Sequence, residues 1–128
     1  MFAVKLDQTQ NVLTILYGGH VGPNEIQLCA AEVRPALSIL QPGFRVVVDL
    51  TELLSMDVSC SPLIADIMEM CNAAGVAEVV RIIPDPTRDI GLQILSFFHY
   101  GTDVYIRTCA STAEAIEVMA RTPTSAEL

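Results

Sequence analysis

A run of three consecutive valines constrains the fold of this chain more than any other feature of its sequence. Residues 44–50 read FRVVVDL and form the clearest strand candidate, directly after Pro42-Gly43. A strand that is apolar at successive positions is typical of one buried on both faces, as at the centre of a parallel sheet. Parallel neighbours need a crossover connection, usually a helix. The rest of the chain should therefore alternate strands with helices.

The remaining segments supply that alternation. Two short runs, residues 2–7 and 12–17, predict strands that form a hairpin, and further strands are predicted over residues 79–83 and 104–109. Apolar residues at helical spacing predict four helices, at residues 23–40, 61–75, 87–100 and 111–121. The order is β-β-α-β-α-β-α-β-α. It predicts an α/β fold with a mostly parallel sheet of about five strands and right-handed crossovers.

Local signals set the expected helix ends. Pro35 predicts a kink or a restart in the first helix, because an interior proline costs about 3 kcal/mol. Ser61 is expected to cap the second helix, with Pro62 at its first position and Gly75 at its end. Residues 111–114 read STAE and fit a capping box for the last helix.

Length and composition indicate one folded domain. The chain has 128 residues, of which 52% are hydrophobic and 17% charged, so intrinsic disorder is excluded. We expect one domain over residues 1–121 and a flexible tail over residues 122–128. No stretch reaches the roughly 20 apolar residues of a membrane span, and residues 1–10 do not form a signal peptide. The four cysteines lack a CxxC pair and fit a reduced, cytoplasmic protein: Cys29, Cys60, Cys71 and Cys109.

Several functional classes are excluded by charge and motif. A net charge of −8 opposes binding to nucleic acid or to an anionic membrane surface. The pair Gly18-Gly19 lacks the spacing of a dinucleotide or phosphate loop, so no cofactor is expected. His20 and His99 have no carboxylate or cysteine at ligand spacing, so no metal is expected either.

Catalysis is not expected. A receiver domain needs an acidic pair and a lysine on its strand ends, whereas the only lysine here is Lys5; Asp49 is interpreted as a strand-end residue that bonds to nearby backbone. A nucleophile at Ser59 or Cys60 would need a histidine base and an orienting acid, and no such pattern is present. The protein is therefore predicted not to be an enzyme.

The turn between the valine strand and the second helix carries a cluster of polar residues. Residues 55–62 read SMDVSCSP and precede a helix, whose first turn presents backbone N–H groups and the positive end of the helix dipole. A phosphate placed there would be stabilised, and it would change the local charge by about −1.5 to −2. Within this turn, Ser61 is interpreted as a helix cap.

The chain resembles the STAS domain, the fold of bacterial anti-sigma factor antagonists. The resemblance is carried by the strand FRVVVDL, the turn SMDVSC, the strand VVRII and the later helix that ends at residue 101. The resemblance covers roughly residues 2–121. The family's turn usually reads hydrophobic residue, Asp, Ser, Ser, Gly. In this sequence those places are taken in order by Met56, Asp57, Val58, Ser59 and Cys60.

The resemblance implies a non-catalytic regulatory protein. In the family the second serine is phosphorylated by a partner kinase that is itself the anti-sigma factor. It therefore implies phosphorylation of Ser59, a supporting role for Asp57, and a surface for such a partner formed by the turn residues Met56, Asp57, Val58, Ser59, Cys60 and Ser61.

Three departures from the family pattern keep an alternative open. Val58 and Cys60 replace the first serine and the glycine, and residues 18–21 lack the aspartate that commonly ends the second strand of family members. The alternative is a degenerate STAS scaffold or small-ligand sensor that self-associates, for example as a homodimer, and is not phosphorylated. The apolar cluster at residues 97–100 is the sequence feature that favours it.

Overall fold

A five-stranded sheet forms the middle layer of the protein. The computed structural model describes residues 1–83 and 104–120, and the strand order in its main sheet is β1-β2-β4-β6-β7. The first two strands pair antiparallel, and every other neighbouring pair in this sheet is parallel. The predicted α/β fold with a mostly parallel five-stranded sheet is confirmed. The strands are β1 (Phe2–Asp7), β2 (Val12–Tyr17), β4 (Arg45–Asp49), β6 (Glu78–Ile82) and β7 (Tyr105–Cys109).

The valine run lies at the centre of this sheet. Strand β4 pairs with β2 on one side and with β6 on the other. Val46 is buried in the larger hydrophobic core, and Val47, whose side chain points to the opposite face, is buried in a smaller cluster. Burial on both faces confirms what the uninterrupted apolar run predicts.

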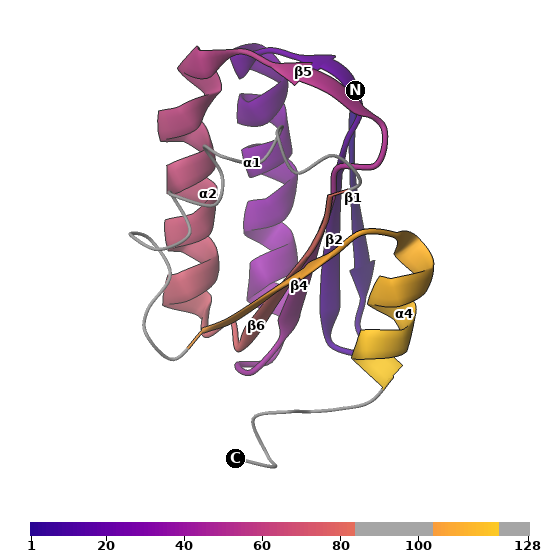
Figure 1. Cartoon of the computed structure of the whole chain (residues 1–128). Helices are drawn as coiled ribbons and strands as arrows, with labels where there is room; N and C mark the ends of the chain where they lie inside the picture. The colour runs from indigo at the N-terminus through magenta and orange to yellow at the C-terminus, as the bar shows by residue number, and fades with distance from the viewer. Residues whose placement is uncertain (84–103, 121–128) are drawn as a thin grey trace.

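Three α-helices cover the sheet in the described part of the chain. Helices α1 (Pro23–Ile39) and α2 (Ser61–Ala74) lie side by side on one face, and α4 (Thr112–Ala120) lies on the other (Figure 1). None of the helices described is long and apolar enough to cross a membrane. The helix predicted over residues 87–100 and the tail predicted from residue 122 lie outside the described residues.

Two expectations about helices α1 and α2 are wrong. Helix α1 continues through Pro35 to Ile39, so the expected restart does not occur; the proline lies on the exposed side of the helix, where the lost hydrogen bond faces solvent. Ser61 is the first residue of α2 rather than its cap, because a 3-10 turn, η1 (Val58–Cys60), runs directly into the helix.

Other local signals act as predicted. Gly75 ends α2 at φ 96°, in the left-handed region that glycine favours. Ser111 Oγ accepts the N–H of Glu114 at 3.1 Å, and the Glu114 carboxylate accepts a backbone N–H from Ala110 at 3.1 Å, one residue earlier than in the standard capping box. Asp49 accepts the N–H of Thr51 at 2.9 Å, which is the backbone bond expected of a strand-end aspartate.

A second, two-stranded sheet was not predicted. Strands β3 (Gly19–Val21) and β5 (Leu53–Met56) pair in parallel beyond the ends of β2 and β4. Both segments read as turns because each is short and flanked by polar residues or glycine. Their buried residues, Val21 and Leu53, join the larger core and fix this ribbon to the domain.

Candidate functional site

The turn singled out in the sequence leaves strand β5 and enters α2. In the parallel register of β3 and β5, His20 lies opposite Ser55 and Val21 lies opposite Met56. The N–H of Asp57 then donates to the carbonyl of Val21 at 3.0 Å, which extends this pairing by one more bond. The start of the turn is therefore held by backbone hydrogen bonds at the carboxyl end of the central strand.

Asp57 and Ser59 form a closed hydrogen-bonded pair. Asp57 Oδ1 accepts the Ser59 backbone N–H at 2.9 Å and the Ser59 hydroxyl at 2.7 Å. These two bonds favour the ionised carboxylate and lower the pKa of Asp57 below its usual value. Asp57 thereby caps η1 and fixes the direction of the Ser59 hydroxyl, so the structure brings together the two residues that the sequence pattern singles out.

Most of the turn is open to solvent. Asp57 and Ser59 are exposed, Val58 is 86% exposed, and Leu54 on the preceding strand is 57% exposed. We call these four residues the turn surface. Met56 and Ser61, also predicted to contact a partner, are half-buried beside it. An almost fully exposed valine thus lies in sequence between the aspartate and the serine of the hydrogen-bonded pair.

The side chain of Cys60, also predicted to contact a partner, lies beneath this surface and not on it. Its side chain is fully buried in the larger core, and Sγ lies 3.7 Å from the carbonyl oxygen of Val21, within reach of a weak thiol hydrogen bond. Burial raises the pKa of the Cys60 thiol. A reactive cysteine has the opposite shift, so this geometry argues against Cys60 as a nucleophile.

His20 and Ser55 form a contact that the sequence did not reveal. The ring nitrogen Nδ1 of His20 and Oγ of Ser55 share a hydrogen bond of 2.6 Å on the exposed side of the β3–β5 ribbon. The two residues are brought together by strands that no short-range pattern predicted. In residues 1–83 and 104–120, no three His, Cys, Asp or Glu side chains are grouped so as to hold a metal ion.

Comparison with solved structures identifies the architecture. No protein-family model matches the sequence, and neither does any curated protein. An uncharacterized protein of the DUF3478 family from Shewanella loihica, described as having a SpoIIAA-like fold, superimposes with a TM-score of 0.71 at 14% identity, over 92% of this chain and 93% of that one. The anti-sigma factor antagonist SpoIIAA in its unphosphorylated form gives a TM-score of 0.65 at 18% identity, over 95% and 100%. The chain has the SpoIIAA-like, or STAS, fold.

A third match comes from a different signalling system. A chain from the complex of the diguanylate cyclase SiaD with its activator SiaC, from Pseudomonas aeruginosa, superimposes with a TM-score of 0.54 at 14% identity, over 84% of this chain and 92% of that one. At such identities the likeness shows the fold alone. The STAS fold predicted from the turn and the element order is thus confirmed.

Proposed function

We propose that this protein is a non-catalytic partner-switching protein of the anti-sigma factor antagonist type. Its turn surface contacts a serine kinase or anti-sigma factor-like protein, and phosphorylation of Ser59 ends that contact. The observation that carries the proposal is the exposed Ser59 hydroxyl, held by Asp57 Oδ1 at 2.7 Å beside the 86%-exposed Val58, immediately before helix α2 of a STAS fold.

The local charge explains why phosphorylation would act as a switch. A phosphoryl group removes the hydroxyl proton that Ser59 donates to Asp57 and places about −1.5 to −2 charges next to that carboxylate. Residues 46–80 contain no lysine or arginine, so this segment offers no basic side chain to neutralise the added charge. Against an acidic surface of the partner, the added negative charge would cost several kcal/mol, which is enough to release that partner.

Apolar contact supplies the affinity of the unmodified form in this proposal. Leu54 and Val58 are among the large hydrophobic side chains that the described residues expose. Burying one such side chain on binding contributes about 1.5–3 kcal/mol. Val58 precedes Ser59 directly, so a phosphoryl group on Ser59 would keep this part of the turn hydrated and would oppose the burial of Val58 in a dry interface.

The proposal is tested by mass and by capture. Intact mass and fragmentation of the protein from its own host should place a phosphoryl group on Ser59. Capture from host lysate should retain the same identified partner with the wild type and Ser59→Ala, and lose it with Ser59→Asp. Ser38, exposed near the end of α1, provides the matched control, because Ser38→Asp adds the same charge far from the turn. Equal capture by Ser59→Ala and Ser59→Asp, with no phosphoryl group on Ser59, would instead support the unphosphorylated scaffold.

A further inference from the structure

Helix α4 is attached to the domain much more lightly than α1 and α2. It is the one described helix on its face of the sheet (Figure 1), where it covers a small cluster that contains Val80, Ile82 and Cys109. Of its nine residues, Ala115 is the one that is buried, Val118 and Met119 are partly buried against the cluster, and Ile116 is 66% exposed. Hydrophobic stabilisation scales with buried apolar area, so packing alone holds this helix weakly.

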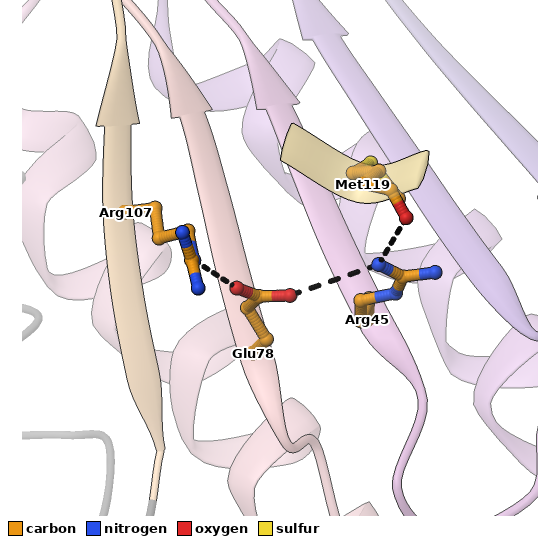
Figure 2. A network of polar contacts seen from close by, with 4 residues as sticks. All are labelled: Arg45, Glu78, Arg107 and Met119. Carbon is orange, nitrogen blue, oxygen red and sulfur yellow. Dashed lines mark hydrogen bonds and ion pairs between the residues drawn. The ribbon is translucent and has the colours of Figure 1, made fainter. Parts of the chain in front are cut away.

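Polar contacts therefore matter more for α4 than for the other helices. At its N-terminal end the helix is capped by Ser111 and Glu114. Its last turn contains no basic residue, yet carbonyl groups and the negative end of the dipole lie there. The sheet supplies the missing cation, because Arg45 Nη1 at the start of β4 donates to the carbonyl of Met119 at 3.0 Å (Figure 2).

The position of Arg45 is set by two neighbouring strands. The carboxylate of Glu78, on β6, lies between two arginines: Oε1 is 3.8 Å from Arg45 Nη1, and Oε2 accepts from Arg107 Nε on β7 at 2.6 Å (Figure 2). The Glu78 side chain is only 7% exposed. We call Arg45, Glu78 and Arg107 the clasp. The two arginines exceed the one carboxylate by a single positive charge, which faces the C-terminal end of α4.

We propose that α4 opens and closes as a unit while the layer formed by α1 and α2 stays folded, and that the clasp sets how often it opens. Opening uncovers Cys109, which is 2% exposed in the closed state, together with the adjacent Val80 and Ile82. The device is a releasable helix that presents a second apolar surface of the domain. The proposal is independent of Ser59 and its phosphorylation.

The cysteines provide a direct test. Cys29, Cys60 and Cys71 are buried in the larger core, whereas Cys109 lies under α4. The native full-length protein is treated with iodoacetamide, and alkylation at each cysteine is followed by peptide mass spectrometry. Independent opening predicts that Cys109 is alkylated at least about tenfold faster than Cys29 and Cys71, since local opening requires less free energy than global unfolding.

Replacing one residue of the clasp provides a second test of the proposal. Arg45→Ala removes a charge-assisted hydrogen bond and should raise the Cys109 rate about tenfold, with Cys109 still the fastest of the four cysteines. Arg34→Ala, at an exposed position of α1, is the matched control and should change none of them. Equal rates at all four cysteines in the wild type, or an unchanged Cys109 rate in Arg45→Ala, would overturn the proposal.

A variant at the other end of the helix covers the case in which Arg45→Ala does not fold. Ser111→Ala removes the N-terminal cap without touching the clasp. It should raise the Cys109 rate several-fold and speed amide hydrogen exchange within α4, with Cys109 and the α4 amides still faster than the core cysteines and the α2 amides. If Ser111→Ala leaves both the Cys109 rate and the α4 exchange unchanged, α4 does not open as a unit.

Discussion

Replacing Cys60 by glycine tests how this turn is built. STAS domains usually have glycine at this position. Cys60→Gly therefore restores the usual motif, and the motif alone would predict that it is tolerated. The structure predicts the opposite. The Cys60 side chain is fully buried in the larger core, with Sγ near the Val21 carbonyl, at the point where η1 passes into α2. Its removal leaves a cavity in that core.

The magnitude follows from the atoms removed. Cys60→Ala deletes one buried heavy atom, and the transfer and cavity contributions together come to about 1.5 kcal/mol. Cys60→Gly also deletes Cβ and adds backbone freedom at a residue with φ −72° and ψ −21°, which raises the loss to about 3 kcal/mol. With about 2.1 cal/mol/K of unfolding entropy per residue over 128 residues, the expected decreases in Tm are about 6 °C and about 11 °C.

Urea unfolding followed by far-ultraviolet circular dichroism measures these losses, since the chain has no tryptophan to report by fluorescence. Val58→Gly is the matched control, because it introduces glycine at an 86%-exposed position of the same turn and forfeits little packing. A Cys60→Gly protein within about 0.5 kcal/mol of the wild type, or more stable than it, would refute the argument that the thiol fills the core.

Three further predictions concern single local devices. Gly75→Ala should lower the free energy of unfolding by about 1–2 kcal/mol in urea titrations, because alanine is strained at φ 96° and its Cβ would lie 3.1 Å from Pro42 Cβ; no loss would contradict the left-handed cap. Ser111→Ala should cost about 1 kcal/mol in the same titration through the lost cap of α4, and an unchanged midpoint would argue against the capping box. In an NMR pH titration, the Ser59 amide resonance should keep its hydrogen-bonded position as pH falls from neutral and shift only below the ordinary pKa of an aspartate. The reason is that the Asp57 pKa is lowered in the folded state, so its stabilising charge is lost only as pH passes through that lowered value. Asp57→Asn should abolish the transition, and a midpoint at or above the ordinary value would contradict the Asp57–Ser59 hydrogen bonds.

The sequence predicted those parts of the fold that depend on local pattern. The valines of β4, the left-handed end of α2 at Gly75 and the cap at Ser111 are each set by residues close together in the chain, so periodicity and capping rules find them. The β3–β5 ribbon was missed because its pairing joins segments more than thirty residues apart, and each strand is too short to show alternation. The contact between His20 and Ser55 was missed for the same reason.

In the candidate site, too, the local contacts could be predicted from the sequence and the long-range contacts could not. Asp57 and Ser59 are two residues apart, and their hydrogen bonds are the local ones that an aspartate at the start of a helical turn makes. Whether Cys60 faces solvent or core depends on how α1 and α2 pack together, which no turn motif encodes. The clasp could not be predicted from the sequence either, because the register of three parallel strands is what brings Arg45, Glu78 and Arg107 together.

The two features proposed to act in this protein lie at opposite ends of the central strand. Strand β4 begins at Arg45, which holds the last turn of α4, and ends at Asp49, just before the ribbon that carries the turn surface. The turn is fixed to the larger core through Leu53 and Cys60, whereas α4 rests on the smaller cluster on the other face. A charge added at Ser59 is therefore presented on a rigid support, and a helix released from the opposite face can move without disturbing it. If both proposals hold, this one small domain has two separately adjustable surfaces, with the doubly buried valines of β4 as the fixed layer between them.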